Sequence, residues 1–416
     1  MKWEMVKLGD IATSIQPGPF GSQLHNSDYS EFGTPLIMPK DMINGHISHE
    51  NLIFVGNEHV SRLSRHQVHE GNIMVARKGD VRKCVYITEN EDGWMTGSDC
   101  LKVALNDAVC FPKFIYYQLR SPYIGKWLET ISIGATMPSL NTGLLSGIEL
   151  VLPPIPIQKR ITDILSAYDD LIENNQKQIK LLEEAAQRLY KEWFIDLRFP
   201  GHENTPIHNG LPDRWNRVSV ADCLAMHING GWGTETEDTK HCFSGKVIRG
   251  TDINDIKSGN YSDIPLRYHT KNDIISRSLI ENDIVFELSN GNINNIGRTL
   301  LIDQYILKQC GNNTICASFC KLFRPIDKMH ALILLFEIQE MQLNGKMLVY
   351  KKHGSNGINN FAFEDFLKHE LLIPDVLQIS PFELSMQKIG ICQQQISQLK
   401  ESSKRLLPKL MNGEMR

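Results

Sequence analysis

Two polar segments of the chain concentrate side chains that hydrogen-bond well to planar or charged partners. The first, ARKGDVRKC, starts at Ala76 and carries Arg77, Lys78, Arg82 and Lys83 around a glycine. Arginine and lysine make bidentate contacts with guanine edges, and glycine lets a loop approach a partner's backbone closely. This composition is typical of a loop that contacts nucleic acid, and equally of a solvated hairpin.

The second segment, ELSNGNINNIGRT, starts at Glu287 and is rich in amides instead of amines. Its side chains of interest are Asn290, Asn292, Asn294, Asn295 and Arg298. Asparagine pairs with adenine edges much as arginine pairs with guanine edges. Each segment follows a short β-like run, NIMVA in the first case and DIVFEL in the second. We therefore predict that both are loops that follow strands.

The sequence carries none of the common catalytic motifs. It has neither GxxxxGK followed by Ser or Thr nor GxGxxG after a strand, and neither HExxH nor GxSxG. The segment CGNNTICASFC spaces its cysteines by six and four residues, whereas zinc sites use closer pairs with a second pair nearby. His66 and His69 lack carboxylates arranged for a metal site, and we predict a surface role for them. The pattern favours a binding protein.

Composition bounds the class of protein. A chain of 416 residues is too long for one ordinary core, so two or more domains are expected. The net charge of −4 gives no basic excess, but a local basic face is enough to bind nucleic acid. No apolar run approaches the roughly 20 residues of a membrane span, and the start MKWEMVKLGD lacks a signal peptide's apolar stretch. We expect a cytoplasmic protein whose nine cysteines are reduced and partly buried thiols.

The chain contains an internal duplication. Five segments of the first half return in the same order, 211 to 221 positions later: WEMVKLGDIA as RWNRVSVADCL, PLIMPKDMING as KVIRGTDINDI, EGNIMV as ENDIVF, ELVLP as ELLIP, and QKQIKLLEEAAQRL as QQQISQLKESSKRL. Repeats of this kind indicate one structural unit used twice. The basic loop and the amide loop stand at equivalent places in the two copies. One scaffold that carries different loops is expected when two different targets are read.

Each copy ends in a long helical pattern. Apolar residues recur at steps of four and three, which is the heptad spacing of a coiled coil. The first series is Ile161, Leu165, Tyr168, Ile172, Asn175, Ile179, Leu182, Ala186, Leu189 and Trp193, and the second is Phe382, Met386, Ile389, Cys392, Ile396, Leu399, Ser403, Leu406 and Leu410. We predict that the two helices pair within the chain along a rod of roughly 48 Å. The alternative is that each helix packs only on its own globule. Asn175 fits a polar residue that fixes the register, or one that faces solvent.

The stretch ELVLPPIPIQKRITDIL joins the first globule to its helix. Prolines 153, 154 and 156 stop the strand from extending, because proline cannot donate to a ladder. They also keep the chain extended before the helix begins. We therefore expect the helix to leave its globule at a fixed angle.

These patterns give an α+β layout. A first globule spans residues 1–153, a helix 154–198, a linker 199–213, a second globule 214–375 and a second helix 376–416. Each globule mixes short β-like runs with helical pieces such as FPKFIYYQLRSPYIGKWL and KMHALILLFEIQEM. The linker FPGHENTPIHNGLPD is rich in Pro, Gly, Asn and His and has no period.

Four stretches, WEMVKLGDIA, GPFGSQLHNSDY, LPPIPIQKRITDIL and VFELSNGNINNIGRTLLI, together with the two-fold plan, resemble the DNA specificity subunit of type I restriction–modification systems. The resemblance covers nearly the whole chain. One departure is that the second helix lacks the PPxxxQ-type start and has ELLIPDVLQISPFEL instead. This leaves the start of that helix open.

The resemblance implies two target-recognition domains of mixed α/β structure, inverted relative to each other and separated by an intramolecular antiparallel coiled coil. Each domain would bind half of an asymmetric, split DNA sequence, and the helices would set the gap. The partners implied are double-stranded DNA, two modification (methyltransferase) subunits and restriction (motor–nuclease) subunits. The chain would be non-catalytic, without cofactor or metal. S-adenosylmethionine, ATP and Mg would be bound by the partners.

We predict the DNA-contacting residues from their basic or amide character on turns at equivalent places: Lys40, Arg77, Lys78, Arg82 and Lys83 in the first domain, and Arg249, Thr251, Asn290, Asn292 and Arg298 in the second. Two other classes of function are compatible with the residues. One is a coiled-coil scaffold whose globules bind protein, and the other is a metal-dependent nuclease whose carboxylates follow no familiar motif.

Overall fold

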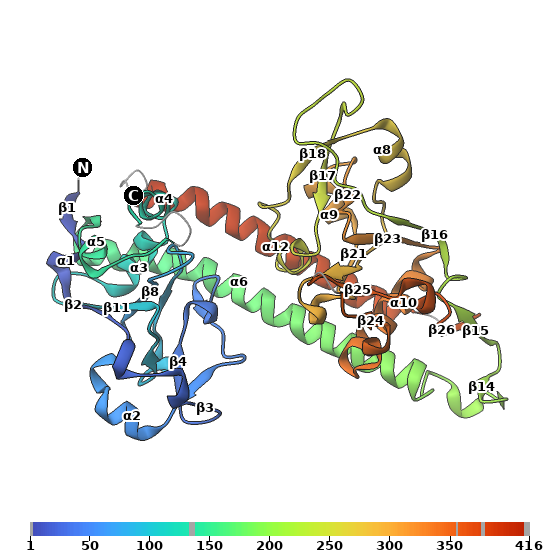
Figure 1. Ribbon diagram of the computed structural model, residues 1–416, viewed down its shortest axis with the longest axis horizontal. Helices are drawn as coiled ribbons and strands as arrows, with labels where there is room; N and C mark the ends of the chain where they lie inside the picture. The colour runs from blue at the N-terminus through green and yellow to red at the C-terminus, as the bar shows by residue number, and fades with distance from the viewer. Residues whose placement is uncertain (1–2, 133–137, 355–356, 376–378, 412–416) are drawn as a thin grey trace. The chain divides into compact units, whose positions relative to one another are not determined.

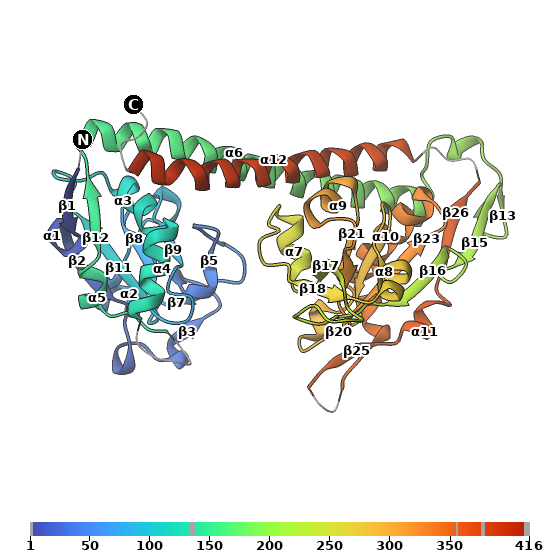
Figure 2. The same ribbon diagram turned by 90° about the horizontal axis from the view of Figure 1, so that it is seen from above.

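The structure is a computed structural model that describes residues 3–132, 138–354, 357–375 and 379–411. The chain divides into two compact units (Figures 1 and 2). Unit 1 comprises Met1–Asp170 with Glu401–Arg416, and unit 2 comprises Leu171–Lys400. The two long helices therefore each contribute to both units, whereas the sequence assigned each helix to a segment of its own.

Unit 1 contains two four-stranded sheets, a hairpin of β5 (Met42–Ile43) with β6 (His46–Ile47), and one further strand pair. The first sheet is antiparallel, and in the second β10 runs parallel to β4. The strands of the first sheet are, in spatial order, β2 (Ala12–Pro17), β11 (Cys100–Leu105), β8 (Ile73–Ala76) and β9 (Cys84–Tyr86). Those of the second sheet are β10 (Met95–Thr96), β4 (Thr34–Ile37), β7 (Ile53–Val55) and β3 (Tyr29–Ser30). The further strand pair is β1 (Glu4–Lys7) with β12 (Glu149–Leu152). Helices α3 (Pro112–Leu119) and α4 (Pro122–Ile131) form where FPKFIYYQLRSPYIGKWL predicts them.

Unit 2 repeats the main part of this topology, which confirms the duplication. Its second sheet has three strands instead of four, and it adds a three-stranded sheet of β20 (Ser289–Asn290), β25 (Asn359–Phe361) and β24 (Lys351–Lys352). Its antiparallel sheet is β16 (Leu224–Asn229), β23 (Cys320–Pro325), β19 (Ile284–Glu287) and β21 (Thr299–Leu301); its second sheet is β18 (Leu266–His269), β17 (Phe243–Ile248) and β22 (Ile315–Cys316); its strand pair is β15 (Trp215–Ser219) with β26 (Glu370–Pro374). As in unit 1, one strand of the second sheet is parallel to its neighbour, here β22 to β17.

The central strands form where the sequence is apolar on both faces. All four residues of β8 and all four of β19 are buried, as expected of strands that are covered on both sides. Helix α10 (Lys328–Leu343) covers the core of unit 2 and buries most of its residues. It begins at Asp327, whose side chain accepts a hydrogen bond from the backbone N–H of His330 at 2.9 Å.

The two long helices are antiparallel neighbours (Figure 2). Helix α6 (Ile155–Tyr190) continues into a π-helical turn, η6 (Lys191–Ile195), and α12 spans Ser380–Met411. In unit 2 the rings of Trp193 and Phe382 lie 5.4 Å apart, while Cys392 Sγ lies 3.9 Å from Gln178 Oε1. Residue numbers therefore increase in opposite directions along the two helices, which means that the helices are antiparallel.

Every residue of both predicted seams is buried or half-buried. In unit 2, Ile179, Ile389 and Ile396 share a hydrophobic cluster. In unit 1, Ile161 and Leu165 share a core with the end of α12. The helices therefore pair with each other, as predicted, and they also complete the cores of the globules. Trp193, for example, belongs to the main core of unit 2. The alternative in which each helix packs only on its own globule is wrong.

The proline-rich junction fixes the start of α6. Strand β12 ends at Leu152 and α6 begins at Ile155. The fully buried Gln158 donates from Nε2 to the carbonyl of Pro153 at 2.7 Å and accepts at Oε1 from the N–H of Phe111 at 2.8 Å. The first turn of the helix is thereby tied to its globule, as the prolines predict. Helix α12 begins at Ser380, without this proline-linked glutamine.

Three smaller expectations are resolved by the structure. The predicted surface role is wrong for His66, which is 5% exposed; its Nδ1 lies 3.1 Å from the carbonyl of Pro17. The cysteines are free thiols, eight of them buried, as predicted, and burial raises the pKa of Cys84 to about 12. The linker is not wholly irregular: it contains a short hairpin of β13 (Ile207–His208) and β14 (Leu211–Pro212).

The described residues contain neither a membrane-spanning helix nor a cluster of metal ligands. No helix in the described residues is long and apolar enough to cross a membrane. Within the same residues, no three His, Cys, Asp or Glu side chains are placed to hold one metal ion.

Candidate nucleic-acid interface

The basic loop of unit 1 joins β8 to β9 and is held in place by ion pairs. Lys78 Nζ lies 3.0 Å from Asp99 Oδ1, and Arg82 Nε lies 2.9 Å from Asp80 Oδ1. Gly79 has a φ of +79° and donates to the carbonyl of Pro138 at 3.1 Å. A left-handed residue without a Cβ is required at this turn. The loop presents its charges from a fixed backbone.

Lys83 of this loop contacts a neighbouring turn that carries a further basic residue, Lys40. Lys83 Nζ donates to the carbonyl of Pro39 at 2.8 Å. Lys40, the next residue, donates from Nζ to Asp41 Oδ1 at 2.7 Å and to the carbonyl of Asn51 at 2.8 Å. The structure therefore places the predicted residue Lys40 beside the predicted loop, although 37 positions separate Lys40 from Arg77 in the sequence.

Asp99 and Asp80, the acidic partners of Lys78 and Arg82, are partly exposed, whereas Asp41, the partner of Lys40, is buried. Burial acts to raise the pKa of Asp80, but the hydrogen bonds and charge of Arg82 hold it below its ordinary value. Asp99 keeps 36% of its side chain exposed, and Asp80 keeps 42%. Ion pairs this exposed contribute about 0–1 kcal/mol each. A phosphate group can therefore replace such a carboxylate as the partner at little cost.

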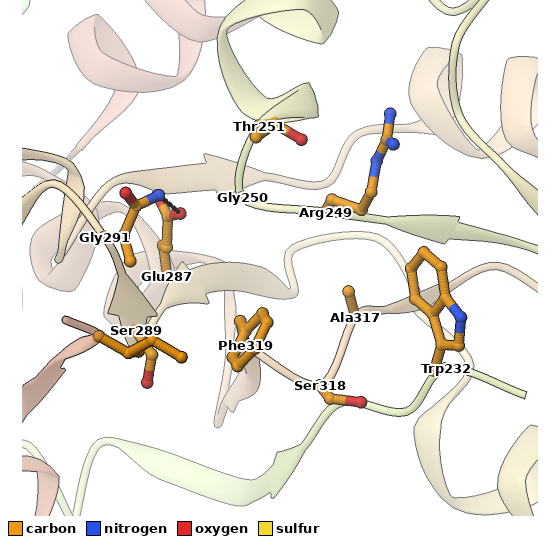
Figure 3. A pocket seen from close by; sticks show the side chains of 12 residues that line it. Trp232, Arg249, Gly250, Thr251, Glu287, Ser289, Gly291, Ala317, Ser318 and Phe319 are labelled. Carbon is orange, nitrogen blue, oxygen red and sulfur yellow. Dashed lines mark hydrogen bonds between the residues drawn. The ribbon is translucent and has the colours of Figure 1, made fainter. Parts of the chain in front are cut away.

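The corresponding region of unit 2 contains a pocket of about 480 Å³ (Figure 3). Its lining residues come from five separate stretches of the chain: Trp232, Arg249, Gly250, Thr251, Glu287, Ser289, Asn290, Gly291, Ala317, Ser318, Phe319 and Ile358. Three residues of the predicted set, Arg249, Thr251 and Asn290, are among them. The sequence had placed them on turns at equivalent positions, and the fold brings them into one cavity.

Glu287 organises the polar side of this pocket. Its carboxylate is 2% exposed and accepts from Asn290 Nδ2 and from Arg298 Nε, both at 2.7 Å. Arg298 also donates to the carbonyl of Gly250 at 2.9 Å. A Cβ at position 250 would lie 2.0 Å from Glu287 Oε1, so this position requires glycine. The buried carboxylate thus has a cationic partner, which it needs in such a site.

The remaining residues of the predicted set have intramolecular partners. Arg249 Nη2 lies 2.6 Å from the buried Asp252, and this hydrogen bond raises the pKa of Arg249. Asn292 accepts from the N–H of Asn294 at 3.0 Å and thereby begins a short helical turn. Arg298 is 21% exposed and lies beneath the pocket floor rather than in its lining. Whether these side chains also contact DNA stays a prediction.

Sequence reasoning missed the aromatic residues of the site. Trp232 and Phe319 line the pocket of unit 2, and in unit 1 the guanidinium of Arg77 lies 5.6 Å above the ring of Phe20. A signal was present, because Trp232 stands in GGWG and Phe20 in GPFG, 212 positions apart. This offset is the one that relates WEMVKLGDIA to RWNRVSVADCL, so the two segments belong to the duplication.

Comparisons with known proteins agree with this geometry. Residues 1–184 match the family model described as Type I restriction modification DNA specificity domain. The whole chain is 24% identical to the type I restriction enzyme MjaIX specificity subunit of Methanocaldococcus jannaschii, of which it covers 94%. The HindI specificity subunit of Haemophilus influenzae is also 24% identical, over 47% of this chain and 41% of its own length.

A solved structure supports the fold. The S subunit of a type I restriction-modification system from M. genitalium superposes with a TM-score of 0.52 at 12% sequence identity, over 100% of this chain and 97% of that one. Duplicated topology, paired helices, family model and relatives lead to the same assignment. The chain is therefore similar over its whole length to type I restriction–modification specificity subunits, and its first 184 residues match the model of their DNA specificity domain.

Proposed function

We propose that this chain recognises an asymmetric, two-part DNA sequence, with each unit reading one half. The observation that supports this most directly is one scaffold with two different loops. The β8–β9 connection presents Arg77, Lys78 and Arg82, whereas the β19–β21 connection presents Asn290 and Asn292. Cationic and amide side chains prefer different base edges. Two units with the same topology and different loop chemistry fit two different half-sites.

The same proposal assigns the chemistry to other subunits. The chain would dock two modification subunits, which carry S-adenosylmethionine and methylate adenine, and restriction subunits, which use ATP and Mg. The chain itself would contribute DNA recognition and no catalytic group. Because its target is chromosomal or invading DNA, we place its action in the cytoplasm. Its buried free thiols are compatible with a reducing compartment.

Methylome sequencing tests this function directly. A host without type I methylation would express the full-length chain together with the modification subunit of its own system. We expect methylated adenines in one bipartite motif with a fixed gap, and none in cells that express the modification subunit alone. Methylation without a motif, or an undivided palindromic motif, would contradict the proposal.

A further inference from the structure

Each unit exposes an aromatic ring between glycines at the same position of the duplication. In unit 1 the segment GPFG ends β2 and presents Phe20, which is 54% exposed. In unit 2 the segment GGWG follows β16 and presents Trp232, which is 40% exposed. Burying a large ring gains roughly 25 cal/mol per Å² of apolar surface. Both copies nevertheless leave the ring in solvent.

The two segments are built in the same way. Gly18 donates to the carbonyl of Cys100 at 3.1 Å, and Gly230 donates to the carbonyl of Cys320 at 2.9 Å. A Cβ at Gly18 would lie 1.9 Å from the carbonyl oxygen of Gly97, and one at Gly230 would lie 2.2 Å from that of Ala317. In both units the first glycine therefore packs on the turn that precedes the neighbouring strand, which is β11 in unit 1 and β23 in unit 2.

The last glycine of each segment completes the turn that presents the ring. Gly21 has a φ of +60° and Gly233 a φ of +72°, values that favour glycine over other residues. The backbone thus holds the aromatic residue between two glycines whose positions no larger residue fills easily. Because both units share this backbone arrangement, we infer that the exposed ring is a specific feature of the scaffold.

A guanidinium lies over each ring, and it comes from a different place in each unit. Arg77 in the β8–β9 loop lies 5.6 Å from the centroid of Phe20, and Arg267 on β18 lies 4.8 Å from that of Trp232. Both units therefore combine an exposed ring with an arginine, although the two arginines do not occupy equivalent positions in the duplication. A ring with a cation beside it suits a ligand that has both a planar aromatic part and a negative charge.

The surroundings of the rings match such a ligand. Trp232 lines the 480 Å³ pocket together with a second aromatic residue, Phe319, which is 58% exposed (Figure 3). The polar groups of Arg249 and Asn290 line the same pocket. Phe20 is adjacent to the basic loop of unit 1 through Arg77. Each ring therefore lies beside the side chains predicted to contact DNA in its own unit.

We propose that Phe20 and Trp232 each contact a nucleobase of the DNA target, one in each half-site. The ring packs against the face or the methyl edge of a base, while the arginine beside it reaches the neighbouring phosphate. In unit 2 the base edge points into the pocket toward Asn290. This inference rests on the proposed function and adds the two residues through which each unit would read one base.

The test is selection from a library of random DNA duplexes by the full-length chain assembled with its modification subunit. Phe20→Ala should relax one or two positions in one half of the selected motif and leave the other half unchanged. Trp232→Ala should do the reverse. Each variant should weaken binding of the wild-type motif about tenfold. Phe20→Trp and Trp232→Phe should restore most of the affinity, because any flat ring can stack.

Matched controls separate a contact from a general loss of surface apolarity. Phe32→Ala in unit 1 and Leu343→Ala in unit 2 remove side chains that are 79% and 74% exposed, and they should leave the motif and the affinity unchanged. If the wild-type complex selects a motif and both alanine variants select the same motif with equal affinity, this inference is overturned while the proposed function stands. If the wild-type complex selects no sequence, the proposed function fails, and the inference fails with it.

A second measurement does not depend on how the variants fold. Duplexes of the wild-type motif that carry 5-iodouracil at single positions would be irradiated in complex with the wild-type chain. Cross-links at Phe20 from one half-site and at Trp232 from the other are expected, and mass spectrometry locates them. Cross-links that map elsewhere from every position of the motif would refute the contact.

Discussion

At the scale of single residues, the predicted DNA contacts fall into two groups. Lys78 and Arg82 have carboxylate partners that are themselves exposed, so DNA can displace these at little cost. Arg298, by contrast, neutralises a carboxylate that is 2% exposed. Removing such a partner leaves a buried charge, which is strongly destabilising. Loss of DNA binding in an Arg298 variant would therefore not by itself identify a contact.

A cleaner prediction concerns Arg82 together with Arg77, whose guanidinium lies over the exposed ring of Phe20. The double variant Arg77→Ala and Arg82→Ala should bind DNA more weakly and should flatten the dependence of log affinity on log salt by about 1.8, because each phosphate contact contributes about 0.9. The measurement is a titration of duplex DNA at several salt concentrations, with Lys7→Ala, on the exposed edge strand β1, as the control. An unchanged affinity and slope would remove both arginines from the interface.

His66 gives a prediction about pH. Burial, assisted by the positive charge of Arg65, lowers the pKa of His66 below its ordinary value. The unfolded chain then binds a proton at this position more readily than the folded chain, so stability rises with pH in this range. The free energy of unfolding should therefore fall as the pH is lowered from 7 to 5.

The matched variants for this prediction are His66→Asn and His69→Asn. The first should flatten the pH profile, because asparagine can still donate to the carbonyl of Pro17 and does not titrate. The second changes a histidine that is 63% exposed and should leave the profile as it is. Urea unfolding midpoints across this pH range measure the effect, and a profile that His66→Asn does not alter would assign the pH dependence to other groups.

At the scale of elements, each globule makes hydrogen bonds to a long helix near a turn that contains glycine. In unit 1 Tyr116 donates to the carbonyl of Gly45 at 2.8 Å, and Arg120 connects Tyr116 to Asp169 of α6. In unit 2, Gly259 follows α7 (Asp252–Lys257), and Gln393 of α12 donates to the carbonyl of Lys257 at 3.1 Å. The duplication thus provides a contact between globule and helix in each unit.

Gly259 allows this contact to be tested. Its φ is +70°, and an added Cβ would lie 2.8 Å from the carbonyl of Gln393. Gly201 is also left-handed, with a φ of +89° and a ψ of 5°, and has open space around it. Gly201→Ala should therefore show backbone strain alone, about 1–2 kcal/mol, whereas Gly259→Ala should lose a further 1–3 kcal/mol or so from overpacking against α12.

Chemical unfolding of both variants measures the difference between them. An equal loss of stability would mean that the turn and α12 are not in close contact in solution. A larger loss for Gly259→Ala would establish that the second globule is packed tightly on its helix.

The helices also show where a sequence pattern stops being informative. The heptad spacing locates the seam correctly, and Asn175 on it is buried. Its Nδ2, however, donates to the carbonyl of Leu171 in its own helix at 2.9 Å. Spacing identifies which residues face the partner helix, but it does not say whether a polar group is satisfied within its own helix or across the interface.

At the scale of the whole molecule, the duplication made the fold predictable. Once EGNIMV and ENDIVF are matched, each strand of the antiparallel four-stranded sheet in one unit has a counterpart in the other. The pocket of unit 2 was not predictable in the same way. Its lining comes from segments near Trp232, Arg249, Glu287 and Ser318, which only the tertiary fold brings together. The burial of Glu287 likewise depends on neighbours that are remote in sequence.

The molecule as a whole gives the last prediction, which concerns spacing. If the paired helices set the gap between half-sites, lengthening both by four residues should add about 6 Å, which is roughly two base pairs at 3.4 Å each. The insertions belong after Asp170 in α6 and after Lys400 in α12, where the chain passes between units. Four residues make slightly more than one helical turn, so the heptad seam continues with little rotation.

The expected outcome is a methylated motif with the same two half-sites and a gap about two base pairs longer. In the proposed function, each half-site is read by loops far along the chain from the insertions, so base preferences within it should not change. Substituting Lys177 with alanine on the exposed side of α6 is a control that alters the helix without lengthening it. A lengthened variant that still methylates the original gap would show that something other than the helix pair fixes the distance.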